Sequence, residues 1–141
     1  MTRVDFHFNA PDTLGYACRL VRKAYRAGQR VVVFADDPAR LASFDQALWS
    51  FSPLDFIPHV RAGDRLAART PVVLASADTE LPHHEVLVNL GARLPPPFFA
   101  RFERLIEVVG AGDDDRAPAR TRFRFYKDRG YPVQTHDLAN A

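Results

Sequence analysis

The sequence predicts an α/β fold, with one domain over residues 1–141 that contains a mostly parallel sheet and flanking helices. Strand-like and helix-like segments alternate at the start of the chain, which favours a parallel sheet over an all-helical bundle. The second strand-like segment is a continuous β-branched and aromatic run, typical of a strand covered on both faces. With 141 residues, 47% of them hydrophobic and 26% charged, the chain has the size and composition of one globular core.

The first strand and helix follow from periodicity. Apolar and polar residues alternate from Val4 to Phe8, which predicts a half-buried strand. A helix starts at Pro11 and Asp12, and Gly28 provides its stop. Its apolar stripe has helical spacing and comprises Leu14, Ala17, Cys18, Val21, Ala24 and Tyr25. Because Cys18 lies on this stripe, we expect a buried structural thiol rather than a nucleophile.

The second strand and helix follow at once. Residues 31–35 predict the strand, and Asp37 and Pro38 predict the cap and the first residue of the helix. That helix carries four apolar residues, Leu41, Phe44, Leu48 and Trp49. Residues 51–68 are irregular in pattern, with Pro53, Pro58 and Gly63 as punctuation.

The rest of the chain predicts three more strands, at residues 72–75, 86–90 and 105–109. The first two are linked by a polar stretch that includes Asp78 and Pro82, and a run of prolines at 95–97 breaks the chain again. Residues 98–102 predict a short turn. A final helix covers roughly residues 117–129 and is ended by Gly130.

Three features indicate a cytoplasmic protein without a membrane segment. No apolar run approaches the roughly 20 residues that span a bilayer, and the amino-terminal residues lack the apolar segment of a signal peptide. The single cysteine excludes an internal disulfide, which fits a reducing compartment.

Nucleotide and metal sites are not expected, so we predict no cofactor. The loop after the first strand, residues 9–12, ends in the carboxylate of Asp12 where a phosphate would sit, and Gly15 stands alone. His83 and His84 are adjacent and would point in opposite directions, and the other histidines lie in different elements without ligand spacing. We therefore interpret the histidines as surface or second-layer residues.

Positive charge is concentrated near the carboxyl end, although the formal net charge is only +2. An acidic run occupies residues 113–115. The next segment, residues 116–129, contains one acid, Asp128, and six cations: Arg116, Arg120, Arg122, Arg124, Lys127 and Arg129. Such a local excess implies an anionic partner at one patch rather than general binding to nucleic acid.

On the predicted helix, one stripe within about 80° of arc holds four cations: Arg116, Arg120, Arg124 and Lys127. Phe123 lies beside the stripe, and at least one of Phe125 and Tyr126, off the stripe, should be buried. The stripe is either a solvated basic face, which the helix dipole explains in part, or an anion site. Its length of about three turns and its one aromatic suit an acidic peptide better than a nucleic-acid backbone.

A second patch is apolar. It packs five large side chains into nine positions: Trp49, Phe51, Leu54, Phe56 and Ile57. Two interpretations are open, core filling under a loop or a protein interface, where Trp and Phe anchors are enriched.

Several motifs occur together in a characteristic order. Asp45–Gln46–Ala47–Leu48–Trp49 is followed by Phe56–Ile57–Pro58–His59, similar to a D-x-A-L-W … F-(I/V)-P-H signature. Residues 24–33 match A-x-x-x-G-x-(R/K)-V-x-V, residues 71–74 match P-V-x-(I/L), and residues 120–131 match a basic carboxyl-terminal helix. Over nearly the whole chain, these motifs resemble the chi subunit family of bacterial DNA polymerase III.

The resemblance implies a non-catalytic replication subunit with a nucleotide-binding-like fold that lacks a phosphate loop. Such a subunit pairs with psi on the clamp loader and captures the acidic, Phe-ending tail of single-stranded-DNA-binding protein, so its contact with DNA is mainly indirect. The tail-binding residues then match Arg116, Arg120, Phe123 and Arg124, and the psi-facing aromatics match Trp49 and Phe56. Because Pro118 interrupts the basic segment, the sequence leaves two positions open for Arg116: on the last helix, or on a loop before a helix that starts later.

Two other interpretations stay open. Asp36 and Asp37 follow a strand end, where catalytic carboxylates of a small α/β enzyme could lie, although Asp37 is explained as a helix cap and Asp36 as a solvated loop residue. A direct nucleic-acid-binding domain is the third possibility, and steep salt dependence would reveal it.

Overall fold

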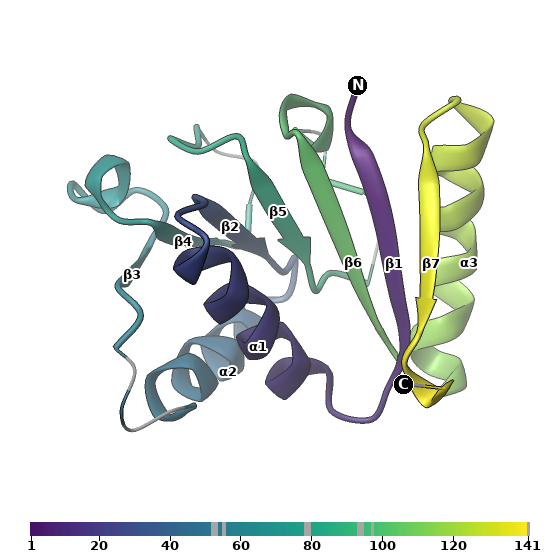
Figure 1. The fold of residues 1–141 in the computed structure, drawn as a ribbon, viewed down its shortest axis with the longest axis horizontal. Coiled ribbons are helices and arrows are strands. Elements are labelled where there is room, and N and C mark those ends of the chain that lie inside the picture. The colour runs from purple at the N-terminus through teal and green to yellow at the C-terminus, as the bar shows by residue number, and fades with distance from the viewer. Residues whose placement is uncertain (52–53, 55, 78–79, 93–94, 97, 141) are drawn as a thin grey trace.

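The computed structural model describes residues 1–51, 54, 56–77, 80–92, 95–96 and 98–140 (Figure 1). Within these residues the chain forms one sheet of seven strands: β1 (Arg3–Ala10), β2 (Val31–Phe34), β3 (His59–Arg61), β4 (Val72–Ala75), β5 (Val86–Asn89), β6 (Arg104–Gly110) and β7 (Val133–Asp137). The same residues form three α-helices: α1 (Thr13–Arg26), α2 (Pro38–Ser50) and α3 (Asp113–Asp128). Every neighbouring pair of strands is parallel, so the predicted α/β class is confirmed.

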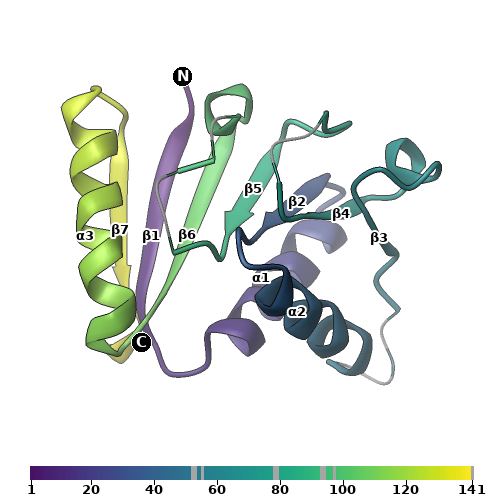
Figure 2. The same cartoon turned by 180° about the vertical axis from the view of Figure 1, so that it is seen from behind.

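The path of the chain explains why helices lie on both faces of the sheet. The strand order is β3-β4-β2-β5-β6-β1-β7, so the chain moves one way from β1 to β2 and the opposite way from β6 to β7. Because crossovers between parallel strands are right-handed, opposite directions place the connecting helices on opposite faces. Accordingly, α1 and α2 cover one face, and α3 lies on the other, against β7 (Figures 1 and 2).

Each face of the sheet buries its own apolar layer. Under α1 and α2, the layer includes Cys18, Val21 and Phe44, all buried. Burial, and to a lesser degree the charge of Asp12, raises the pKa of the Cys18 thiol to about 11, which confirms the prediction of a buried structural cysteine. The layer under α3 is rich in aromatic rings: Phe6, Phe34, Phe98, Phe99, Phe102 and Tyr126.

Two strands carry no clear sequence signal. β3 is three residues long and lies within the irregular segment of residues 51–68. β7 lies at an edge of the sheet, and all five of its residues are exposed or half-buried, so no apolar alternation marks it. The other strands and α1 and α2 lie within a few residues of their predicted bounds.

The last helix differs from its prediction. It begins at Asp113 rather than at residue 117, so Pro118 lies inside it and Arg116 is on the helix, not on a loop. The acids of its first turn, Asp113, Asp114 and Asp115, stabilise the helix amino terminus through the dipole. Pro118 lacks the N–H that would bond the Asp114 carbonyl, so the helix lacks one hydrogen bond within its first turns. The predicted late start is therefore wrong.

The short turn expected at residues 98–102 is a 3-10 helix, Phe99–Arg101. Pro53, Asp78 and Pro97, which the sequence marks as breaks in regular structure, lie outside the described residues. In the part of the chain that the structure describes, no helix combines the length and the apolar character needed to cross a membrane.

A buried polar network joins α3 to the sheet. Glu107 of β6 has no exposed surface. Its carboxylate accepts hydrogen bonds from three side chains: Arg122 Nε (3.1 Å), Tyr126 Oη (2.7 Å) and Asn89 Nδ2 (3.0 and 3.1 Å). Burial, reinforced by the Glu107 charge, raises the pKa of Tyr126, which therefore stays a neutral donor. Arg122 also donates from Nη1 to the Ala92 carbonyl (3.1 Å), so this cation is internal and does not belong to the surface charge.

Replacing Arg122 with Met should lower the free energy of unfolding by about 3–5 kcal/mol, because it leaves the Glu107 carboxylate buried without its counter-charge. The double variant Glu107→Gln/Arg122→Met, which removes both charges, should recover part of that loss. Urea unfolding of wild type and variants measures the difference. Arg124→Met, at an exposed position of the same helix, is the matched control and should change stability by less than about 0.5 kcal/mol. Equal stability of the Arg122 and Arg124 variants would contradict this account of the network.

Candidate functional site

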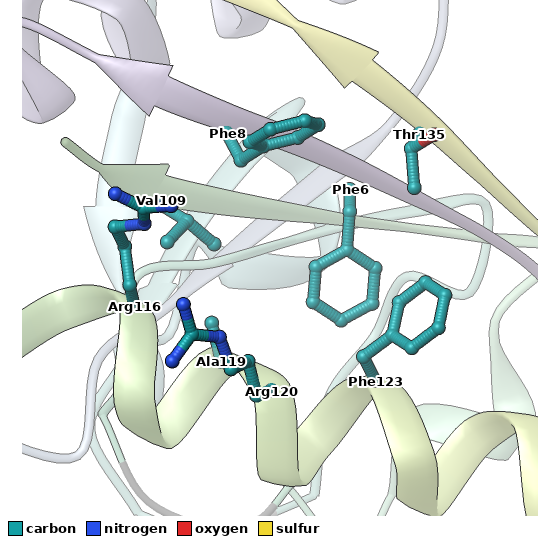
Figure 3. A pocket seen from close by; sticks show the side chains of 8 residues that line it. All are labelled: Phe6, Phe8, Val109, Arg116, Ala119, Arg120, Phe123 and Thr135. Atoms are coloured by element: carbon teal, nitrogen blue, oxygen red, sulfur yellow. The ribbon is translucent and has the colours of Figure 1, made fainter. Parts of the chain in front are cut away.

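A pocket opens between α3 and the sheet, on the face opposite α1 and α2 (Figure 3). We call it the α3 pocket. Its volume is about 180 Å³, and four elements line it: Phe6 and Phe8 of β1, Val109 of β6, Thr135 of β7, and Arg116, Ala119, Arg120 and Phe123 of α3. Three aromatic rings contribute to the wall, and two guanidinium groups stand on its helical side (Figure 3). This combination suits a ligand with an apolar ring next to an anion.

The rings of the α3 pocket are held in place by packing. Phe6 meets Phe123 edge to face with ring centroids 5.4 Å apart, and it meets Tyr126 at 5.9 Å. Phe6 is buried, whereas Phe8 and Phe123 are half-buried and leave ring surface at the pocket. Tyr126 also donates a hydrogen bond to Glu107. The same side chain therefore supports Phe6 in the wall of the pocket and fixes the position of α3 on the sheet.

The α3 pocket contains three of the four residues predicted to bind the tail: Arg116, Arg120 and Phe123. Arg124, the fourth, is exposed and does not line the pocket. Four residues of a helix make slightly more than one turn, so each fourth residue is rotated by about 40° around the axis. Arg116, Arg120 and Arg124 therefore point progressively farther from the sheet. Arg124 comes last in the series that starts at Arg116 and is turned farthest from the buried side marked by Tyr126.

The sequence does not identify the pocket residues contributed by strands: Phe6, Phe8, Val109 and Thr135. The alternation of Phe6 and Phe8 is the only available signal, and it equally fits ordinary core positions. Thr135 gives no signal, because it lies on the unpredicted strand β7.

A second feature is an exposed apolar surface, the Trp49–Phe56 surface, formed by Trp49, Leu54 and Phe56. The exposed fractions of these residues are 55%, 94% and 64%, and the rings of Trp49 and Phe56 pack 5.5 Å apart. Ile57, in contrast, is only 4% exposed and belongs to the core. Core filling is therefore confirmed for Ile57 and wrong for Trp49, Leu54 and Phe56. Phe51 is half-buried and packs against the core.

A polar clamp holds the Trp49–Phe56 surface together. His59 Nδ1 donates to the Ile57 carbonyl (2.8 Å), and its Nε2 lies 2.9 Å from Asp45 Oδ1. The His59 ring also packs against Trp49, with centroids 4.7 Å apart. The clamp ties β3 to the end of α2, so Trp49 and Phe56 meet although an irregular segment separates them. This contact gives a physical reason for the spacing between the Asp45–Trp49 and Phe56–His59 motifs.

The carboxyl ends of β2, β5 and β6 border a crevice of the kind in which α/β folds commonly bind ligands. Its volume is about 120 Å³, and the protein's own polar groups bond to one another across it. Asp37 caps α2 by accepting from Ala39 N (2.9 Å), as predicted, and Arg40 Nε donates to the Leu90 carbonyl (2.9 Å). Asp36 lies in the loop after β2, as predicted; it is half-buried and also accepts from Ala92 N (3.3 Å).

The loop after β1 is closed by a carboxylate. Asp12 caps α1, because its Oδ1 accepts from Gly15 N (3.0 Å). A Cβ at Gly15 would clash with the Asp12 carboxylate, which shows how closely the two approach. The carboxylate occupies the position at the helix amino terminus where nucleotide-binding proteins of this architecture hold a phosphate.

The histidines are more buried than the sequence suggests. His7, His59 and His83 are buried, which excludes a surface position for them and leaves the second-layer interpretation, whereas His84 and His136 are exposed. The opposite burial of His83 and His84 agrees with their predicted opposite directions. The described residues contain no group of three or more His, Cys, Asp or Glu side chains that could hold a metal ion.

His7 lies in a cluster that joins β1, α1 and β7. Its Nδ1 is hydrogen-bonded to Tyr16 Oη, its ring lies 4.5 Å from that of His136, and its Nε2 has no hydrogen-bond partner among the described residues. Burial is the main cause that lowers the pKa of His7 to about 4. Among its charged neighbours, Asp5 raises this pKa and three others lower it: His136, Arg104 and Lys23.

Comparisons with known proteins match the chain to one family. The family model described as DNA polymerase III chi subunit, HolC, matches residues 1–134 of the chain. The chain is 39% identical over 142 residues to the DNA polymerase III subunit chi of Pseudomonas aeruginosa, with 98% of each chain covered. It is 26% identical to the protein of that name from Haemophilus influenzae, which covers 86% of this chain and 85% of the relative. For Escherichia coli (strain K12) the identity is 25%, over 84% of this chain and 80% of the relative.

Acidification should destabilise the protein between pH 6.5 and about 4, because in that range the unfolded chain binds a proton at His7 and the folded protein does not. Above pH 6.5 His7 is neutral in both states, and below about pH 4 it is protonated in both, so the effect is then complete. His7→Asn keeps a hydrogen-bonding group for Tyr16 but does not titrate, and should flatten this part of the profile. Melting temperatures of wild type, His7→Asn and the exposed control His84→Asn measure the effect. Parallel profiles for wild type and His7→Asn would contradict the prediction.

Proposed function

The chain belongs to the DNA polymerase III chi subunit family, and from this we propose that it links the clamp loader, through psi, to the acidic tail of single-stranded-DNA-binding protein during DNA replication. The α3 pocket is the proposed tail site, and the Trp49–Phe56 surface is the proposed psi interface. One observation carries the proposal: an aromatic pocket and two guanidinium groups lie together on α3.

The α3 pocket fits the end of a chain that terminates in Phe. A cavity of about 150 Å³ holds benzene, so a pocket of about 180 Å³ has room for a phenyl ring. The walls for that ring are Phe6, Phe8 and Phe123. The terminal carboxylate belongs to the same residue as the ring and therefore lies near the guanidinium groups of Arg116 and Arg120, which hold carboxylates in bidentate fashion.

The acids that precede the terminal Phe have a different set of partners. Arg124 and Lys127 are exposed on the same helix, outside the pocket, and follow Arg120 along the stripe. We assign Arg124 to these upstream carboxylates rather than to the ring or the terminal carboxylate. Arg122 has no such role, because its guanidinium is bound to Glu107.

Arg120→Ala should weaken binding of an acidic, Phe-ending peptide by about 1–3 kcal/mol, the range typical of a hydrogen bond to a charged group. Arg124→Ala should cost less, about 0–1 kcal/mol, because Arg124 lies outside the pocket, where an ion pair forms in solvent and contributes little. Phe123→Ala should also weaken binding, since it removes a wall of the pocket. A titration of labelled peptide followed by fluorescence anisotropy measures all three.

The controls separate a specific site from general attraction between opposite charges. A scrambled peptide of the same composition keeps the charge but not the terminal Phe and should bind weakly. Arg65→Ala, at an exposed cation distant from α3 in the sequence, is the matched variant and should leave affinity unchanged. Equal binding of both peptides would contradict a specific site, and so would equal weakening by the Arg65 and Arg120 variants. The basic stripe would then be an ordinary solvated face of the helix.

The Trp49–Phe56 surface supports the proposed psi interface. Three large apolar side chains are exposed, and two of them, Trp49 and Phe56, pack against each other and are aromatic residues of the type that anchors interfaces. The clamp between Asp45 and His59 holds the rings in a fixed arrangement, which reduces the entropy that binding of a partner would cost.

Phe56→Ala should weaken psi binding by on the order of 2 kcal/mol, a typical effect at an interface anchor. It should leave the melting temperature nearly unchanged, because the residue is 64% exposed in the free protein. Calorimetric titration with psi and thermal melting measure the two effects. Leu66→Ala, at another exposed apolar residue outside this surface, is the matched control. A large fall in melting temperature for Phe56→Ala would mean that the ring belongs to the core.

We propose that this role is non-catalytic and cytoplasmic, that one chi-like domain over residues 1–141 performs it without a cofactor, and that contact with DNA is mainly indirect. Two observations support this over a small α/β enzyme. Asp12 fills the usual phosphate position, and Asp36, the candidate catalytic acid, is engaged by the backbone of Ala92. Both groups therefore serve the fold.

A further inference from the structure

A second concentration of positive charge lies on α1, across the sheet from the α3 pocket. Between Thr13 and Ala35 the sequence has no acid, and it has five cations: Arg19, Arg22, Lys23, Arg26 and Arg30. The first four fall within about 100° of helical arc. The helix dipole favours cations in the last turn, which accounts for Lys23 and Arg26 but not for Arg19 or Arg22.

Two of these cations, Arg19 and Lys23, line a cavity of about 300 Å³ between α1 and the sheet. Its polar lining includes Arg19, Lys23 and Tyr16 of α1, His7 of β1 and Arg104 of β6. Arg104 Nε is paired with Asp5 Oδ2 at 2.7 Å. Neither Arg19 nor Lys23 has an ion pair among the described residues, so the cavity wall carries an excess of positive charge.

His7 gives an independent indication that this cavity takes a ligand. The residue is only 8% exposed, and its Nε2 has no hydrogen-bond partner among the described residues. When the Tyr16 hydroxyl donates to Nδ1, Nε2 carries the proton and is a buried donor without an acceptor. An anionic oxygen in the cavity would supply that acceptor. Lys23 and Arg104 would attract the anion, since their positive charges are close enough to His7 to lower its pKa.

We propose that the α1 surface, formed by Arg19, Lys23, Arg26, Arg104 and His7, binds the phosphodiester backbone of single-stranded nucleic acid. The cations from Arg19 to Arg26 extend over about 10 Å of helix, which suits a row of phosphates better than a single one. The Tyr16 ring, with Arg19 Cζ 5.5 Å from its centroid, adds the aromatic and guanidinium planes on which bases stack. This inference does not depend on the tail or psi proposals, because it concerns other residues on the opposite face of the sheet.

The test uses the intact protein and a labelled oligothymidine of about 20 nucleotides, with anisotropy measured at several salt concentrations. The double charge reversal Arg19→Glu/Lys23→Glu should lower affinity at least about tenfold and flatten the slope of log K against log salt by about 1.4, or about 0.7 for each of the two phosphates that the variant no longer neutralises. The matched control is Arg120→Glu/Arg124→Glu on α3, which changes the net charge equally and should alter affinity less than about twofold. In wild type, the His7 ring resonances should shift when the oligonucleotide is added.

Three outcomes would overturn the proposal. Equal loss of oligonucleotide affinity in the α1 and α3 double variants would mean that only the net charge of the protein matters. A polyglutamate that competes as well as the unlabelled oligonucleotide would make the surface a site for acidic peptides instead. Unchanged His7 resonances at saturating oligonucleotide would place the binding elsewhere. The proposal is supported if the α3 variant loses binding of the tail peptide but keeps binding of the oligonucleotide. That result would show that the two ligands bind at separate sites.

Discussion

The arrangement of α3 depends on the buried carboxylate of Glu107. A carboxylate without solvent contact is stable only when donors surround it, and two of its three donors, Arg122 and Tyr126, come from α3. These bonds fix both the rotation of the helix about its axis and its position along β6. The rotation then determines which residues of α3 face the strands, so Arg116, Arg120 and Phe123 line the pocket. The interior ion pair thus controls the surface that we propose to be functional.

Residues of the same type therefore play opposite roles within one basic segment. Arg122 and Arg124 are separated by a single residue, yet the first is 3% exposed and the second faces solvent. The sequence distinguishes them only by helical angle, and angle alone does not say which side of the helix is buried. The apolar Tyr126 ring and the Glu107 carboxylate supply that information, and both are contacts between distant parts of the chain. This is why the basic segment could be predicted from the sequence but the burial of Arg122 could not.

Much of the fold follows from local chemistry that the sequence states directly. Asp12 and Asp37 cap α1 and α2, and the inner strands are continuous apolar runs, because both of their faces are covered. The edge strand β7 lacks such a run, since one edge and part of its surface meet water. The start of α3 is ambiguous in the sequence because two local rules conflict: Pro118 disfavours helix, and the acids at 113–115 favour a helix amino terminus. The partial prediction of the pocket has a similar cause, because Phe6 and Phe8 alternate as core residues do.

The topology separates two basic surfaces that the net charge of +2 conceals. The helices of opposite crossover direction, α1 and α3, must lie on opposite faces of a parallel sheet, so their cations are kept apart by the whole thickness of the core. Each surface also has its own local chemistry. On α3 the arginines stand beside aromatic rings, which suits a short peptide end, whereas on α1 the cations run in a row beside a cavity with an unpaired histidine nitrogen. Because the sites share no residue, a ligand on one face does not exclude a ligand on the other, and a protein tail and a nucleic-acid strand could be held by the same small fold at the same time.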